Sequence, residues 1–246
     1  NVFWSRLIRR VGQTIRDFNL IEDGDRILVA VSGGKDSWSM LSLLMHFQRV
    51  SPIQFELFPV TIHPGFADFN ATAIETGYRE VCPDLQWKVV MTQINETIKT
   101  KNTPGKHPCA FCARLRRGAL YRVAEESGYN KIALGHHADD ALETVLISAM
   151  FEGNMVSLPP RLKAEKFDLQ LIRPLIRLWE EHLVRLSKHL QFPITSCGHE
   201  EMSGGARSYI KGIIKQIHGD YPSARENFLA SLHRIKPAHF LDNKWL

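Results

Sequence analysis

The chain has 246 residues, of which 44% are hydrophobic and 23% are charged, and its formal net charge is +5. This composition excludes a disordered or fibrous chain, and the sequence shows neither an apolar run that could cross a bilayer nor a secretory signal pattern. We therefore expect a cytoplasmic protein with no membrane association and one main domain with appendages. The mild basic excess favours a polyanionic partner.

Strands and helices alternate along the predicted chain. An amphipathic helix over residues 3–18 is interpreted as a packing helix, with a membrane-surface helix as the alternative. Residues 27–31 are apolar without alternation, which is typical of a strand buried on both faces. Residues 95–108 are polar and basic, and they are predicted to form a loop. Further strands are expected at residues 55–62, 87–94, 131–135 and 169–176, and further helices at residues 67–81, 111–127, 136–153, 179–190, 210–217 and 225–235.

This alternation predicts an α/β protein with a doubly wound, five-stranded parallel sheet. We divide the chain into an N-terminal helix (residues 1–24), a main α/β domain (residues 25–192) and a C-terminal helical extension (residues 193–246). Ligands of such sheets lie beyond the carboxyl ends of the strands. Polar residues that follow the predicted strands are therefore expected to converge at one edge.

The first predicted strand ends in a glycine-rich turn with the sequence SGGKDS. Backbone N–H groups in such a turn, together with the start of the next helix, favour an anion such as phosphate. An ordinary strand-to-helix turn is the alternative. The turn is not a Walker site, because Asp36 follows the lysine and Val29 occupies the position of the distal glycine. The residues expected to bind the phosphates are Ser32, Gly33, Gly34, Lys35, Asp36 and Ser37.

Two other predicted strand ends carry polar residues. His63 follows the second strand, and the segment GHHADD, residues 135–140, follows the fourth. We expect His63, Gly135 and His136 to lie near a nucleotide whose phosphates bind the SGGKDS turn. Asp36 and Asp139 are candidate ligands of an Mg²⁺ ion beside these phosphates. For residues 135–140, the alternatives are a simple helix cap formed by an aspartate and a zinc site.

The four cysteines are too few and too unevenly spaced for a secreted disulfide scaffold. Cys109 and Cys112 form a C-x-x-C pair at the start of a predicted helix, where the helix dipole favours thiolates. In a reducing compartment this pair predicts a metal, a cluster or redox chemistry. Cys197 is a reasonable third ligand. A structural zinc bound by these cysteines and neighbouring histidines is the alternative. Cys82 is interpreted as a buried thiol.

The basic residues Arg114, Arg116 and Arg117 follow the C-x-x-C pair. They form either phosphate contacts or a solvated helix face.

Several segments together resemble the tRNA-cytidine(32) 2-sulfurtransferases, or tRNA 2-thiocytidine synthetases, within the N-type ATP pyrophosphatases (PP-loop proteins). These segments are SGGKDS, CAFCARLRRGALYR, ALGHHADDALET, MVSLPPRL, IRPL and YPSARENFLASLHRIKPAHF.

The resemblance implies that ATP adenylates a cytidine in the anticodon loop of a tRNA, and that sulfur then reaches the base through a [4Fe-4S] cluster. It further implies a homodimer and a sulfur donor such as a cysteine desulfurase. The expected catalytic residues are Cys109, Cys112, Cys197, Asp139 and Arg116, of which the three cysteines would hold the cluster.

The chain departs from the family pattern at its third cysteine. Cys197 is followed by Gly198, His199 and Glu200, whereas the family commonly has a second C-x-x-C there. Three ligands still suffice, because they leave one iron open for sulfide.

Two alternative functions remain: a tRNA-adenylating enzyme similar to lysidine synthetases, which needs no cluster, and a nucleotide-binding protein with a structural zinc.

Overall fold

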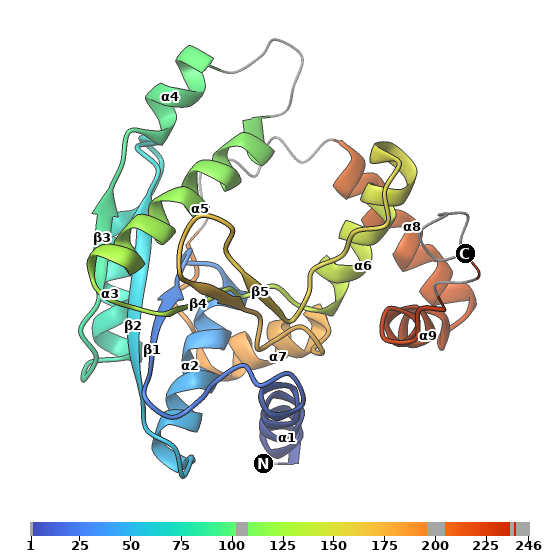
Figure 1. Cartoon of the computed structure of the whole chain (residues 1–246), viewed down its shortest axis with the longest axis horizontal. Coiled ribbons are helices and arrows are strands. Elements are labelled where there is room, and N and C mark those ends of the chain that lie inside the picture. The colour runs from blue at the N-terminus through green and yellow to red at the C-terminus, as the bar shows by residue number, and fades with distance from the viewer. Residues whose placement is uncertain (1, 102–107, 196–204, 237–238, 240–246) are drawn as a thin grey trace. The chain divides into compact units, whose positions relative to one another are not determined.

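The computed structural model describes residues 2–101, 108–195, 205–236 and 239, and the larger of its two compact units is built on a six-stranded sheet (Figure 1). The strand order is β3-β2-β1-β4-β6-β5. All neighbouring strands pair in parallel except β5, which runs antiparallel to β6 at one edge. The strands are β1 (Asp25–Ala30), β2 (Phe55–His63), β3 (Lys88–Met91), β4 (Lys131–Ala133), β5 (Arg161–Lys163) and β6 (Gln170–Ile172).

The predicted doubly wound α/β fold is confirmed, with a sixth strand that the sequence did not predict. Strand β5 has only three residues, and all of them are exposed, so neither alternation nor an apolar run marks it. Its pairing with β6, which joins Leu162 to Leu171, holds it in the sheet. Short strands whose stability comes from a neighbour leave little signal in the sequence.

Helices cover both faces of the sheet. Segment 95–108, predicted as a loop, contains most of α4 (Ile94–Lys101), because Ile94 and Ile98 lie on one helical face and are buried. Helix α3 starts at Ala71 and not at residue 67, because the Asn70 side chain caps it by accepting a hydrogen bond from the Ala73 N–H at 2.9 Å. The other helices are α1 (Val2–Asp17), α2 (Lys35–Val50), α3 (Ala71–Val81), α5 (Pro108–Glu126), α6 (Ala138–Ile147), the π-helical turn η1 (Ser148–Glu152), α7 (Glu180–Leu190), α8 (Ala206–Asp220) and α9 (Ala224–Ser231).

Successive residues of β1 serve two different hydrophobic clusters. Ile27 and Val29 point into the cluster formed with α1, α2, α3 and α7, whereas Leu28 points into the cluster formed with α4 and α5. All three side chains are fully buried. The uniformly apolar sequence of this strand follows from burial on both faces.

The chain divides into two compact units. The larger unit, residues 1–137 and 159–203, contains the sheet with α1 to α5 and α7. The smaller unit, residues 138–158 and 204–246, contains α6, η1, α8 and α9. The functional division at residues 24 and 192 stays a prediction. In the described part of the chain, no helix is both long and apolar enough to span a membrane.

A buried ion pair ties β4 to the start of β1. The Lys131 ammonium lies 2.6 Å from Asp25, and both side chains are almost inaccessible, at 2% and 5%. Asp25 also accepts hydrogen bonds from the Glu22 N–H and the Asn130 side chain. The arrangement satisfies a carboxylate that would be costly to bury alone.

We predict that Lys131→Met lowers the free energy of unfolding by about 3–5 kcal/mol, because it leaves the Asp25 carboxylate buried without its cation. Urea denaturation followed by circular dichroism measures the change. Lys163→Met is the matched control, since its pair with Asp168 is exposed, and it leaves the stability nearly unchanged. Equal stability of the two variants would contradict the importance of the buried pair.

Candidate functional site

The loop after β1 and the loop after β4 meet at the carboxyl edge of the sheet. The strand order reverses there, and ligands of doubly wound folds bind at such a switch point. Gly135, in the loop after β4, touches the first turn of α2: a Cβ at this position would lie 3.3 Å from the Asp36 carbonyl and from the Ser37 nitrogen. The absence of a side chain at Gly135 therefore permits this close backbone approach.

The SGGKDS loop is folded around two serine hydroxyls. The Ser37 hydroxyl accepts a hydrogen bond from the Ser32 N–H at 3.1 Å and donates one to the Gly34 carbonyl at 2.9 Å. The Ser32 hydroxyl lies 3.3 Å from that of Ser37. Helix α2 starts directly after Gly34, and no side chain caps it. Its first N–H groups and its dipole thus form a site for an anion.

Gly33 adopts a conformation that favours glycine and contacts a segment distant in sequence. Its φ is +89°, and an added Cβ would lie 2.1 Å from the Thr195 hydroxyl oxygen. The Thr195 N–H donates a hydrogen bond to the Gly33 carbonyl at 3.0 Å. The segment that leads towards Cys197 is therefore attached to the SGGKDS loop through Thr195.

Lys35 carries the charge of the loop. Its ammonium lies 3.2 Å from Asp36 and 3.0 Å from Glu180, the first residue of α7. Burial alone would lower the pKa of Lys35, but the Asp36 charge and the Glu180 hydrogen bond outweigh it and raise this pKa. The side chain is therefore a cation at neutral pH, balanced by two carboxylates.

The cysteines differ in their surroundings. Cys112 is half-buried on α5, three residues after Cys109 and close to the start of the helix. The side chain of Cys109 and all of Cys197 lie outside the described residues. Cys82 is fully buried, and burial raises the pKa of its thiol to about 11. Within the described residues, no three potential metal ligands gather at one point.

Helix α5 begins at the same edge of the sheet as the SGGKDS loop. The helix leads into the amino end of β4, so its own first turns face the carboxyl edge. Arg116 follows Cys112 by four residues and is half-buried on the same helix. Arg114 packs over the Phe111 ring, with 5.0 Å between the guanidinium carbon and the ring centre.

The other predicted residues lie at two places. His63 ends β2, where its Nδ1 accepts a hydrogen bond from the Gly65 N–H and its ring contacts Phe69. His136 follows Gly135 in the loop after β4. Asp139 lies in the first turn of α6 in the smaller unit, 3.7 Å from Arg225.

Three residues near the carboxyl edge were missed by the sequence interpretation: Glu180, Thr195 and Arg173. Arg173 follows β6, is 2% exposed and donates a hydrogen bond to the Pro159 carbonyl at 2.6 Å. Burial, together with the nearby Arg117 charge, lowers its pKa to about 10. Arg173 lies in the IRPL segment, which contributed to the family resemblance but indicated no role for this residue. No local sequence pattern indicated a role for Glu180 or Thr195.

The fold and the loop define a PP-loop protein, and the family model described as PP-loop domain matches residues 5–194. A tRNA-cytidine(32) 2-sulfurtransferase of Syntrophotalea carbinolica is 40% identical over 243 residues, which cover 96% of this chain and 93% of that protein. One of Geobacter metallireducens is 36% identical, covering 95% and 91%. The chain therefore belongs to the tRNA-cytidine(32) 2-sulfurtransferase family of transferase enzymes.

A solved structure has the same fold. The U34-tRNA thiolase NcsA of Methanococcus maripaludis, determined with its [4Fe-4S] cluster, aligns with a TM-score of 0.79 at 22% sequence identity. The alignment covers 98% of this chain and 84% of NcsA. At this identity the likeness concerns the fold alone.

We predict that Gly33→Ala lowers the free energy of unfolding by about 1–3 kcal/mol, because alanine is strained at positive φ and its Cβ meets Thr195. Gly34→Ala is the matched control, since φ there is −79° and the nearest atom to the new Cβ is 3.6 Å away. Urea denaturation of both variants measures the difference. Similar losses at both positions would contradict the role of Thr195 and of the positive φ.

We predict that iodoacetamide at neutral pH labels Cys112 but not Cys82 in the folded, cluster-free protein. A thiol with a pKa of about 11 holds almost no thiolate at neutral pH, and Cys82 is also buried. Peptide mass spectrometry locates the labels, and urea-unfolded protein provides the control in which both cysteines react. Labelling of Cys82 in the folded state would show that its environment is more open than described.

Proposed function

We propose that this protein is a cytoplasmic enzyme that converts cytidine 32 of tRNA into 2-thiocytidine. ATP first adenylates the O2 atom of the base, and sulfur then replaces that oxygen at C2. The observation that carries this proposal is the anion site of the SGGKDS loop, at the same sheet edge as the start of the helix that holds Cys112. An activation site and a sulfur site on one edge fit a thiolation in two steps.

The loop is suited to bind the phosphates of ATP. Backbone N–H groups at the start of α2 would donate to phosphate oxygens, and the lysine ammonium would add a positive charge. Lys35 contacts Asp36 and Glu180 in the structure, so phosphates would compete with these carboxylates for it. Asp36 and Asp139 are the proposed Mg²⁺ ligands, in keeping with the preference of this ion for one or two carboxylates plus phosphates. His63, Gly135 and His136 are proposed to lie near the nucleoside.

The adenylation step balances without a further reactant. The cytosine O2 attacks the α-phosphorus of ATP, its bond to phosphorus forms, and pyrophosphate leaves. Lys35 and the loop N–H groups would stabilise the charge that develops on the departing pyrophosphate. The O2 atom then belongs to AMP, which leaves with the electron pair of the C2–O bond when sulfide, sulfur at the −2 oxidation level, attacks C2. Arg116 is proposed to hold the phosphate of the adenylated base.

The cysteines of α5 fit two ligands of a [4Fe-4S] cluster. Positions 109 and 112 are three residues apart on one helix and therefore share a face, and the dipole at the start of the helix favours thiolates. Cys197 is the proposed third ligand, two residues after Thr195, which hydrogen-bonds to the loop at Gly33. When bound through three cysteines, such a cluster supplies an open iron position that can carry sulfur.

The partners follow from this chemistry. The substrate would be a tRNA whose anticodon loop presents a single-stranded cytidine, since a base in a loop is splayed from its stack more easily than one in a duplex. A cysteine desulfurase is the proposed source of sulfur, and a homodimer is the proposed assembly.

We predict that Cys112→Ser abolishes 2-thiocytidine formation and cluster binding, whereas Cys82→Ser preserves both, because Cys112 is half-buried near the start of α5 and Cys82 is buried in the core. Each variant is expressed in cells that lack the native gene, and tRNA nucleosides are measured by mass spectrometry. Anaerobic purification followed by iron and acid-labile sulfide analysis reports on the cluster.

The outcomes separate the alternatives. A colourless, iron-free wild-type protein that still releases AMP with tRNA would favour the enzyme similar to lysidine synthetases. ATP binding without turnover, together with bound zinc, would favour a nucleotide-binding protein. Unchanged 2-thiocytidine in cells that lack this protein would refute the proposed function.

A further inference from the structure

A basic pocket of about 740 Å³ lies between α1 and α7 in the larger unit. We call it the arginine pocket. On α1 it is lined by Arg6, Arg9 and Arg10, and on α7 by Glu181, His182 and Arg185. Its volume far exceeds that of a single hydrated ion, so an extended ligand fits it better than a small anion does.

The arginine pocket carries an excess of positive charge. Four guanidinium groups line it against the single carboxylate of Glu181. Within the described residues, no carboxylate forms an ion pair with Arg6, Arg9 or Arg10, whereas Arg26, Arg79, Arg177 and Arg207 elsewhere in the chain have acidic partners. These cations can therefore bind a polyanion without first giving up an internal partner.

Three of the four pocket cations lie on α1, a helix that is fixed to the rest of the unit. Leu7 and Val11 of α1 are buried in the core. Beyond the pocket, Arg177 forms an ion pair with Asp17 at the end of α1. Arg185 is held over the Phe3 ring, with 4.2 Å between its guanidinium carbon and the ring centre. Pre-positioned cations lose less conformational entropy when they bind a ligand.

The arginine pocket lies close to the SGGKDS loop along α7. The helix begins at Glu180, which contacts Lys35 at 3.0 Å, and Glu181 and His182 already line the pocket. Arg185 follows Glu180 by five residues, which is about 7.5 Å along a helix axis. A macromolecule with one nucleotide in the site could therefore place its neighbouring phosphates in the arginine pocket.

We propose that the arginine pocket binds phosphates of the tRNA backbone and so positions the anticodon loop over the SGGKDS loop. This inference rests on the proposed function, because it takes tRNA as the substrate. Phosphate contacts of this kind fix register and orientation without reading sequence. Arg6 and Arg10 are neighbours four residues apart on α1, so they can contact successive phosphates.

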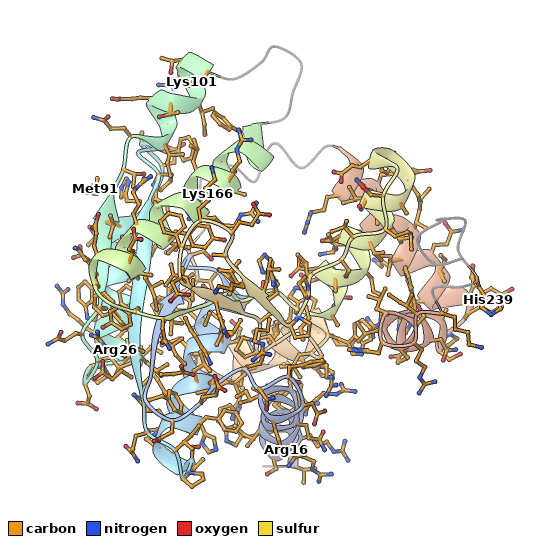
Figure 2. All side chains as sticks on the ribbon, in the orientation of Figure 1. Arg16, Arg26, Met91, Lys101, Lys166 and His239 are labelled. Atoms are coloured by element: carbon orange, nitrogen blue, oxygen red, sulfur yellow. The ribbon has the colours of Figure 1, made fainter. Side chains whose placement is uncertain are left out.

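The test compares two double variants with equal loss of charge. Arg6→Ala/Arg10→Ala removes pocket cations, whereas Arg16→Ala/Arg49→Ala removes exposed cations outside the pocket (Arg16 is labelled in Figure 2). Binding of an unmodified tRNA transcript with cytidine at position 32 is measured over a salt series. The plot of log affinity against log salt should become shallower by about 1.4–1.8 for the pocket variant, because two phosphate contacts are lost. The control should keep the wild-type slope.

ATP binding by both double variants should equal that of the wild type, which shows that the fold is intact. If the pocket variant and the control bind tRNA alike while the wild type still forms 2-thiocytidine, the arginine pocket inference fails and the proposed function stands. If the pocket variant instead changes the mass in analytical ultracentrifugation with an unchanged salt slope, the pocket is a contact between two copies, and the inference also fails. A wild type that neither binds nor thiolates tRNA overturns both proposals.

Discussion

The site depends on the close approach of two backbone segments at the switch point of the sheet. Gly135 lies against the first turn of α2, and Gly33 lies against Thr195, so side chains are excluded from both contacts. These approaches hold the SGGKDS loop between the segment after β4 and the segment around Thr195. Helix α2 starts without a side-chain cap. An anion can therefore bind the unpaired N–H groups of its first turn in place of a cap. Lys35 and its two carboxylate neighbours, Asp36 and Glu180, add the charges of the site to this backbone arrangement.

Much of this arrangement could be predicted from the sequence, because its parts are continuous in the chain. The apolar run of β1 followed by SGGKDS marks a strand, a turn and a helix within a few residues. Glu180 and Thr195 could not be found in the same way, since both are more than a hundred residues from the loop and reach it only through the fold. Helix α4 was missed because its buried isoleucines are surrounded by polar residues.

Burial separates Cys82 and Cys112, the two cysteines whose side chains the structure describes, into different chemical classes. Cys82 behaves as a small hydrophobic residue of the core, where the low polarity suppresses its ionisation. Cys112 lies near the start of a helix and is only half-buried, so part of this residue is exposed to solvent. The same helix carries basic residues in its next turn, so the proposed sulfur chemistry and the proposed phosphate contacts would share one support. A helix is a precise platform for such groups, because its side chains keep a constant spacing.

The two outer strands of the sheet are unlike its centre. Strand β5 has three exposed residues, including Arg161 and Lys163, and β3 has four, of which Lys88 and Met91 are exposed. Short, charged borders offer few unpaired backbone groups to a foreign strand, and placing a lysine there adds electrostatic repulsion between copies. The sheet can thus keep a largely apolar interior while resisting edge-to-edge polymerisation in a crowded cell.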